Sequence, residues 1–304
     1  MSRKGPLFNP YVAVLFATLS ISTSAIWVRL SSAPAAVIAF YRLFFTILLM
    51  TPFLYQHVKA FRAIKLKNLL WCAFAGVSLA FHFILWFVSL EYTSVASSVV
   101  LVTLQPLFAF AGSLLLFKEK LHFGALVGAG SAIFGSFLIS WGDFGVSRAA
   151  LFGDLLALAA CLMITVYLMV GQSVRRDMNL FTYTYLVYAF ATVTLFIYVL
   201  CSREPFVPYP AQDWIMFMLL AVFPTLLGHS IFNWSVKWVG VNTLSMSILG
   251  EPVGAAILAY FLFHEALHPM QIIGSLIILS GIFIYLRLES RQKAKQRLSY
   301  SENA

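Results

Sequence analysis

Charged residues are scarce in this chain of 304 residues, because Asp, Glu, Lys and Arg together make up only 10% of it. A typical soluble domain carries about 25% charged residues. The scarcity therefore excludes an ordinary soluble enzyme or binding domain. The net charge of +9 does not indicate a nucleic-acid partner, because the basic residues lie in short loops between apolar runs.

Cysteine is rare as well, and the sequence lacks the common signatures of a metal site. Cys72, Cys161 and Cys201 show no spacing that is typical of metal ligands or of a disulfide. No HExxH motif is present, and no pair of carboxylates falls within two facing apolar runs. We therefore expect no catalytic residue, no bound metal and no cofactor.

Apolar residues make up 61% of the chain and fall into continuous runs. A helix needs about 20 such residues to cross the hydrocarbon core of a bilayer. The runs predict an all-α polytopic membrane protein with ten transmembrane helices. The expected spans are 10–30, 35–54, 68–90, 94–117, 122–141, 151–170, 181–201, 213–237, 243–263 and 269–287.

The basic residues are distributed unevenly over the two sides of this topology. Of the 20 Lys and Arg residues, 16 fall on the side of both chain ends, and Arg29, Arg148 and Arg203 fall on the other. Cytoplasmic loops are rich in Lys and Arg. We therefore expect both termini in the cytoplasm of a cell that carries the protein in its plasma or bacterial inner membrane. The first span is expected to be retained, and 288–304 to form a basic cytoplasmic tail.

The chain also repeats itself at an offset of 146 positions. The offset pairs Pro106 with Pro252, Glu119 with Glu265, Gly128 with Gly274 and Gly135 with Gly281. Since each half contains five spans, an odd number, the halves 1–147 and 148–287 must insert in opposite orientations. This inverted repeat is the plan of many secondary transporters. The matched glycines would let helices approach closely.

These motifs carry a resemblance to a known family. The stretch from Pro106 through Phe117-Lys-Glu-Lys-Leu to Gly135 resembles the repeated motif of EamA-type proteins of the drug/metabolite transporter superfamily, and the stretch from Pro252 to Gly281 resembles its second copy. Arg42, within Ala39-Phe-Tyr-Arg-Leu, is similar to the family's arginine in span 2. The resemblance covers nearly the whole chain. It implies a ten-helix carrier of small metabolites, often an exporter of amino acids or related compounds, and leaves the substrate open.

The most informative span is 244–263, which holds Glu251 and Pro252 near its middle. A carboxylate at that depth is costly and is expected to face protein or water. Proline removes a backbone donor and loosens the preceding turn. The two residues together are typical of a solute or ion site, although an acid neutralised by a fixed basic neighbour would look the same. The repeat places Gln105 at the position that corresponds to Glu251.

Two further spans carry polar residues on one helical face. His229 and Asn233 are separated by four residues in span 213–237, and His82 and Trp86 are separated by four in span 68–90. Such residues either bond to neighbouring helices or line a wet cavity. Because these faces contain His and Asn, we expect the cavity.

Arg42 enters its span from the outer side, and three roles remain open for it. It could extend back to the membrane surface, pair with Glu251, or bind a carboxylate of the substrate. The aromatic residues Tyr41, Trp86 and Trp234 could wall an apolar cavity. Aromatics make up 16% of the chain, however, so most of them must face lipid or pack.

The sequence therefore predicts a secondary transporter that moves a small organic metabolite, such as an amino acid or a related amphipathic compound, by alternating access. Export is the favoured direction. A buried acid that binds and releases a proton would couple transport to the proton gradient, and His82 or His229 could share that task. An uncoupled facilitator, an importer and an intramembrane enzyme are the alternatives. The expected partners are the substrate, the lipid bilayer and, if transport is coupled, protons; the protein could be a monomer or a homodimer.

Overall fold

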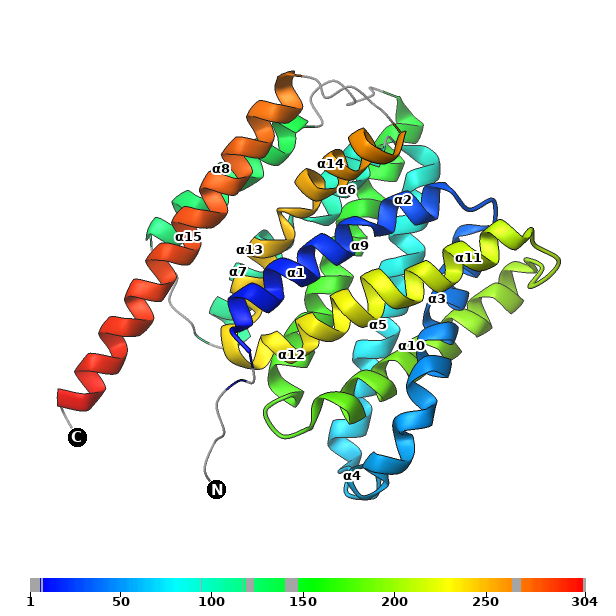
Figure 1. Ribbon diagram of the computed structural model, residues 1–304, viewed down its shortest axis with the longest axis horizontal. Helices are drawn as coiled ribbons and strands as arrows, with labels where there is room; N and C mark the ends of the chain where they lie inside the picture. Colours follow the sequence, from blue (N-terminus) through cyan, green and yellow to red (C-terminus); the bar gives the residue numbers. More distant parts are fainter. Residues whose placement is uncertain are drawn as a thin grey trace.

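The computed structural model describes residues 8–93, 95–116, 123–139, 147–263 and 269–302, together with the single positions 6 and 118. This part of the chain folds into helices and contains no strand, which confirms the all-α class. Figure 1 shows a bundle of long helices with α8 and α15 side by side along one edge. The red end of α15 and the helix α4 both lie toward the lower edge of the same view.

The first half of the chain ends with α8. Its elements are α1 (Pro10–Ser22), α2 (Ser24–Arg29), α3 (Ala35–Met50), the 3-10 helix η1 (Thr51–His57), α4 (Val58–Arg62), α5 (Leu66–Tyr92), α6 (Val95–Val102), α7 (Gln105–Leu116) and α8 (Phe123–Ile139).

The second half begins with α9 and contains a π-helix. Its elements are α9 (Arg148–Val174), α10 (Leu180–Ser202), α11 (Ala211–Leu220), the π-helix η2 (Ala221–His229), α12 (Ser230–Val239), α13 (Val241–Ile248), α14 (Glu251–Phe263) and α15 (Pro269–Glu302). The side chains of Ser147 and Asn179 cap α9 and α10 by accepting hydrogen bonds from backbone N–H groups in the first turn.

The helices agree closely with the spans expected from the sequence. Among the described residues, nine helical stretches are long and apolar enough to cross a membrane. A tenth apolar stretch, Leu126–Ile139, corresponds to the expected span 122–141 but is shorter within the described part of the chain. Glu119 and Glu265, which the repeat pairs with each other, lie outside the described residues.

Two of the spans are broken at the prolines of the repeat. One consists of α6 and α7, and the other of α13 and α14. Pro106 and Pro252 are the second residues of α7 and α14, where the missing N–H of proline costs no helical hydrogen bond. Gln105 and Glu251 are consequently the first residues of the two half-helices. The unpaired N–H groups of a helix start give such positions a partial positive charge.

A third irregularity, which the sequence analysis does not anticipate, lies between α11 and α12. The π-helix η2 contains Pro224. Because this proline cannot donate a backbone hydrogen bond, it favours a change in the hydrogen-bond ladder at this point. The hydroxyl of Thr225 donates to the carbonyl of Leu220, five residues earlier, at 2.8 Å. The widened turn brings both Thr225 and His229 to buried positions.

The glycines of the repeat lie where α8 and α15 touch. A Cβ atom added at Gly128 would lie 2.8 Å from the carbonyl oxygen of Gly281, and one added at Gly135 would lie 2.6 Å from that of Gly274. Positions 128 and 135 ascend along α8 while their partners 281 and 274 descend along α15, so the two helices are antiparallel. This contact lies within one chain.

We predict that Gly135→Ala destabilises the protein, because the new methyl group would collide with the backbone of α15. A collision with packed backbone typically costs about 1–3 kcal/mol of unfolding free energy. Gly130→Ala is the matched control on α8, since no described atom lies within 4 Å of its added Cβ and alanine favours a helix over glycine. Thermal unfolding in detergent measures both variants. Equal melting temperatures for the two would contradict the close pairing of α8 and α15.

Candidate functional site

The side chain of Arg42 on α3 is completely buried. Its Nε donates to the hydroxyl of Thr225 on η2 at 2.8 Å, and its Nη1 donates to the hydroxyl of Ser24 on α2 at 2.9 Å. The guanidinium carbon lies 4.2 Å from the centre of the Phe83 ring on α5. A cation in this position is stabilised by two hydroxyl oxygens and a π face. Arg42 therefore does not extend back to the membrane surface.

Glu251, the first residue of α14, is an acidic residue that interacts electrostatically with Arg42. Its side chain is 4% exposed, and its carboxylate lies close enough to Arg42 for the two charges to attract each other. The structure shows no ion pair between them within the described part of the chain. Gln105, the counterpart of Glu251 in the repeat, is also 4% exposed, and its Oε1 has no hydrogen-bond partner among the described residues.

The two histidines lie close to Arg42 from different helices. His82 on α5 contacts the carbonyl oxygen of Ala160 on α9 through Nδ1 at 3.0 Å, and its ring stacks on Trp86 with 5.8 Å between centres. His229, at the end of η2, meets the Phe83 ring edge to face at 5.7 Å. The Phe83 ring, which lies against the Arg42 guanidinium, contacts both histidines, and its centre is 5.0 Å from that of the His82 ring. The contact with Ala160 requires the proton of neutral His82 on Nδ1, which leaves Nε2 as an acceptor.

Asn233 on α12 ties this group of residues to α9. Its amide nitrogen donates to the hydroxyl of Tyr167, and the ring of Tyr167 lies 6.3 Å from that of His229. The Nε of Arg175, at the end of α9, donates to the backbone carbonyl of Asn233 at 3.1 Å. These contacts fix α12 against α9 next to Arg42.

The structure thus brings Arg42, Glu251, His82, His229, Trp86 and Asn233 into one buried group, which we call the central cluster. Several of its polar atoms have no hydrogen-bond partner among the described residues: Arg42 Nη2, His229 Nδ1, Asn233 Oδ1 and Trp86 Nε1. An unpartnered buried polar atom typically costs about 1–3 kcal/mol. The central cluster therefore offers donors and an acceptor that a polar ligand could satisfy.

Two residues named from the sequence lie elsewhere. Tyr41 donates its hydroxyl to the carbonyl of Phe206 at 3.0 Å, and its ring stacks on Phe217 at 4.9 Å. It therefore packs against the segment between α10 and α11. Trp234 is only partly buried, whereas its neighbour Asn233 points into the central cluster.

The partners of Arg42 include residues that no sequence motif indicates. Ser24 and Phe83 contact its guanidinium directly, and Tyr188 on α10 interacts with it electrostatically. A signal for Ser24 exists in the sequence, because Ser20, Ser22, Thr23 and Ser24 gather near the end of the first span. The aromatic residues carry no such signal in a chain with 29 phenylalanines and 13 tyrosines.

The described residues hold no group of three or more His, Cys, Asp and Glu side chains that could bind a metal ion. The central cluster itself combines one cation, one acid, two imidazoles and an amide. Such a set can bind and orient a polar solute or exchange protons with it, but it has no arranged nucleophile and base of the kind that covalent catalysis uses.

Comparison with known sequences decides the family. The profile of the EamA-like transporter family matches this chain twice, at residues 9–141 and 151–287. The chain belongs to the EamA-like transporter family. It is therefore a multi-pass membrane protein of a transporter family, and the resemblance seen in its motifs is confirmed.

Relatives of this family member are named as transporters. An uncharacterized transporter of Archaeoglobus fulgidus is 22% identical over 279 residues, which cover 90% of this chain and 95% of the relative. The uncharacterized transporter YetK of Bacillus subtilis is 26% identical, over 74% of this chain and 70% of its own length. The riboflavin transporter ImpX of Fusobacterium nucleatum is 22% identical, over 65% and 68%. These names argue against an enzyme.

A solved crystal structure shares the fold. It superposes with a TM-score of 0.72 and 21% sequence identity, over 92% of this chain and 98% of the other.

We predict that Thr225→Val destabilises the protein through Arg42, because the valine methyl cannot accept the hydrogen bond from Nε. Loss of a hydrogen bond to a buried charge typically costs about 1.5–3 kcal/mol. Thr192→Val is the matched control, since the hydroxyl of the buried Thr192 donates only to the carbonyl of Tyr188 in its own helix; we expect a loss of about 1 kcal/mol or less. Thermal unfolding in detergent compares them, and equal losses would show that Thr225 does not stabilise the cation.

Proposed function

We propose that this protein is a secondary transporter that moves a small organic metabolite across the membrane through the central cluster. One observation carries the proposal: Arg42, His229, Asn233 and Trp86 are buried in a membrane bundle and still present unpartnered polar atoms. Buried polar groups with a purely structural role normally satisfy one another. A site that receives a polar solute leaves some of them free to bind it.

The proposed mechanism is alternating access by two halves, 1–147 and 148–287, in opposite orientations. Three observations support it. The family profile matches once in each half. The half-helices α7 and α14 begin at corresponding positions, 105 and 251. The antiparallel contact of α8 and α15 pairs Gly128 with Gly281 and Gly135 with Gly274, and the offset of 146 exchanges these two pairs. Two similar packings of such halves would open the centre to one side and then to the other.

The proposed orientation has both termini in the cytoplasm, on the basis of the Lys and Arg distribution. Export is the proposed direction. The proposed cargo is an amino acid or a related amphipathic compound. Arg42 Nη2 suits an anionic oxygen of such a cargo, while Trp86 and Phe83 offer apolar surface beside it. The relative named as a riboflavin transporter supports an organic cargo for this fold.

Glu251 is the proposed coupling residue. It is the first residue of α14, it is almost completely buried, and it interacts electrostatically with Arg42. A proton on this carboxyl would remove its attraction for Arg42 and free the guanidinium for an anionic group of the cargo. Release of that proton on the opposite side would restore the attraction. Proton movement and cargo movement would then be linked at one pair of residues.

We predict that Glu251→Gln abolishes the dependence of transport on a pH gradient, because glutamine has the shape of the protonated acid and cannot release a proton. The measurement is flux in proteoliposomes with and without a pH gradient. Glu91→Gln is the control, since Glu91 is an exposed acid near the end of α5, and it is expected to keep the response. If Glu251→Gln responds to the gradient as the unmodified protein does, proton coupling at this residue is ruled out and uncoupled transport remains.

The cargo itself can be identified by comparing metabolites in medium and cells that overproduce either the intact protein or Glu251→Ala. A solute whose distribution shifts only with the intact protein identifies the cargo and, from the sign of the shift, the direction. Hydrolysis and acyl-transfer assays on the purified protein test the enzyme alternative. Enzymatic turnover in these assays, together with no measurable transport of any solute in proteoliposomes, would contradict the proposal.

A further inference from the structure

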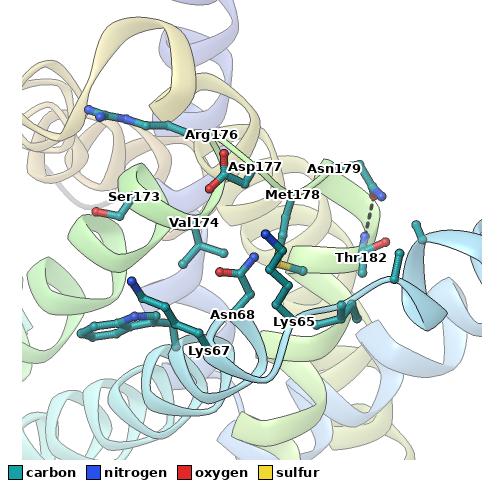
Figure 2. A pocket seen from close by; sticks show the side chains of 14 residues that line it. Lys65, Lys67, Asn68, Ser173, Val174, Arg176, Asp177, Met178, Asn179 and Thr182 are labelled. Carbon is teal, nitrogen blue, oxygen red and sulfur yellow. Dashed lines mark hydrogen bonds between the residues drawn. The ribbon is translucent and has the colours of Figure 1, made fainter.

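A large cavity lies at the membrane face that carries α4. None of the residues that line it belongs to the central cluster. It has a volume of about 1020 Å³ and lies between the start of α5, the end of α9 and the start of α10. Figure 2 shows Lys65, Lys67 and Asn68 extending from the start of α5 toward residues at the end of α9. We call this space the basic cavity.

The charges of the basic cavity favour an anion. Lys65 and Lys67 extend into it, against a single acid in the lining, Asp177; Arg176 also lines it, with its guanidinium directed away from the two lysines (Figure 2). Both α5 and α10 begin at the cavity, and helix starts present partial positive charge. The hydroxyl of Thr182, which is 1% exposed and also lines the cavity, has no hydrogen-bond partner among the described residues. It adds a donor within the wall.

An apolar groove adjoins the basic cavity. The groove has a volume of about 470 Å³ and shares Trp71 and Ser173 with the cavity. Its remaining lining is apolar and includes Phe74, Leu116 and Val166. Phe74 is 50% exposed and Leu116 is 69% exposed. In a membrane protein such side chains face the hydrocarbon region, and a tryptophan at the junction is typical of the headgroup level.

We propose that the basic cavity and its apolar groove bind one anionic phospholipid. The phosphate and headgroup lie among Lys65, Lys67 and Thr182, and one acyl chain lies in the groove between α5, α7 and α9. The two adjoining spaces, which share Trp71 and Ser173, favour a lipid over a free anion, because a soluble anion would make no contact with the apolar groove. This site is independent of the proposed transport function.

The lipid would connect parts of the chain that are far apart in sequence. It would touch the start of α5, the end of α7 and the end of α9 at one point. Helix α9 also carries Tyr167, whose hydroxyl accepts a hydrogen bond from Asn233 of the central cluster. Occupancy is therefore expected to raise the thermal stability of the bundle, because a ligand that binds only the folded state stabilises it.

The test measures lipid binding to the full-length, delipidated protein by native mass spectrometry, with thermal unfolding in parallel. The probes are phosphatidylglycerol, phosphatidylethanolamine with the same acyl chains, and glycerol 3-phosphate. We expect phosphatidylglycerol to bind best and to raise the melting temperature most. Lys65→Gln/Lys67→Gln is expected to bind it about 25-fold more weakly, since each basic residue near an anionic lipid contributes about fivefold.

Three further variants separate a specific lipid site from general effects of charge or misfolding. Lys59→Gln/Arg62→Gln removes two charges from the neighbouring α4, outside the cavity lining, and is expected to bind as the unmodified protein does. Asp177→Asn removes the acid from the lining and is expected to bind about fivefold more tightly, a gain that misfolding cannot produce. Val166→Phe fills the groove and is expected to weaken phosphatidylglycerol binding.

Three results would overturn the proposal. Equal binding of phosphatidylethanolamine would show that the basic residues do not select the headgroup. Equal binding of glycerol 3-phosphate would show a soluble-anion site without a role for the groove. Equal losses in the Lys65/Lys67 and Lys59/Arg62 variants would show that only the general charge of this face matters.

Discussion

The structure depends on how the charge of Arg42 is held inside a membrane bundle. An isolated charge in the hydrocarbon region is strongly unfavourable. Here the guanidinium is shielded by the hydroxyls of Ser24 and Thr225 and by the ring of Phe83, and Glu251 attracts it electrostatically without forming an ion pair among the described residues. The three contacts come from α2, η2 and α5. The cation therefore fixes these three elements around one point.

Irregular backbone supplies the positions that this arrangement needs. The π-helix η2 carries Thr225 to Arg42, and the break before α14 places Glu251 at a helix start. Non-helical backbone is tolerated within a membrane where it is covered by protein or lines a cavity. The regular helices α8 and α15, with their glycine contacts, form a close antiparallel pair at one edge of the bundle. The protein thus combines a closely packed edge with a centre whose helices are interrupted.

The sequence predicted the helices far better than the contacts. Continuous apolar runs located the spans, and the prolines at 106 and 252 located two of the breaks, because both signals are local. The π-helix was missed because Pro224 alone does not distinguish a kink from a widened turn. The sequence offers Tyr41 as a wall of an apolar cavity, yet adjacent residues on a helix point about 100° apart, and Tyr41 packs against Phe206 and Phe217 while Arg42 lies in the central cluster. Phe83 and Ser24 became recognisable once distant helices were brought together.

The central claim is that both membrane faces can reach the break where the half-helices begin. The most direct measurement uses Gln105→Cys in a protein whose Cys72, Cys161 and Cys201 are replaced by alanine. Gln105 suits this purpose because it is the first residue of α7 and its Oε1 has no hydrogen-bond partner among the described residues. A membrane-impermeant thiol reagent is applied to one side of oriented vesicles and then to the other. The account predicts labelling from each side; a thiol that reacts from one side only, or from neither, would contradict it.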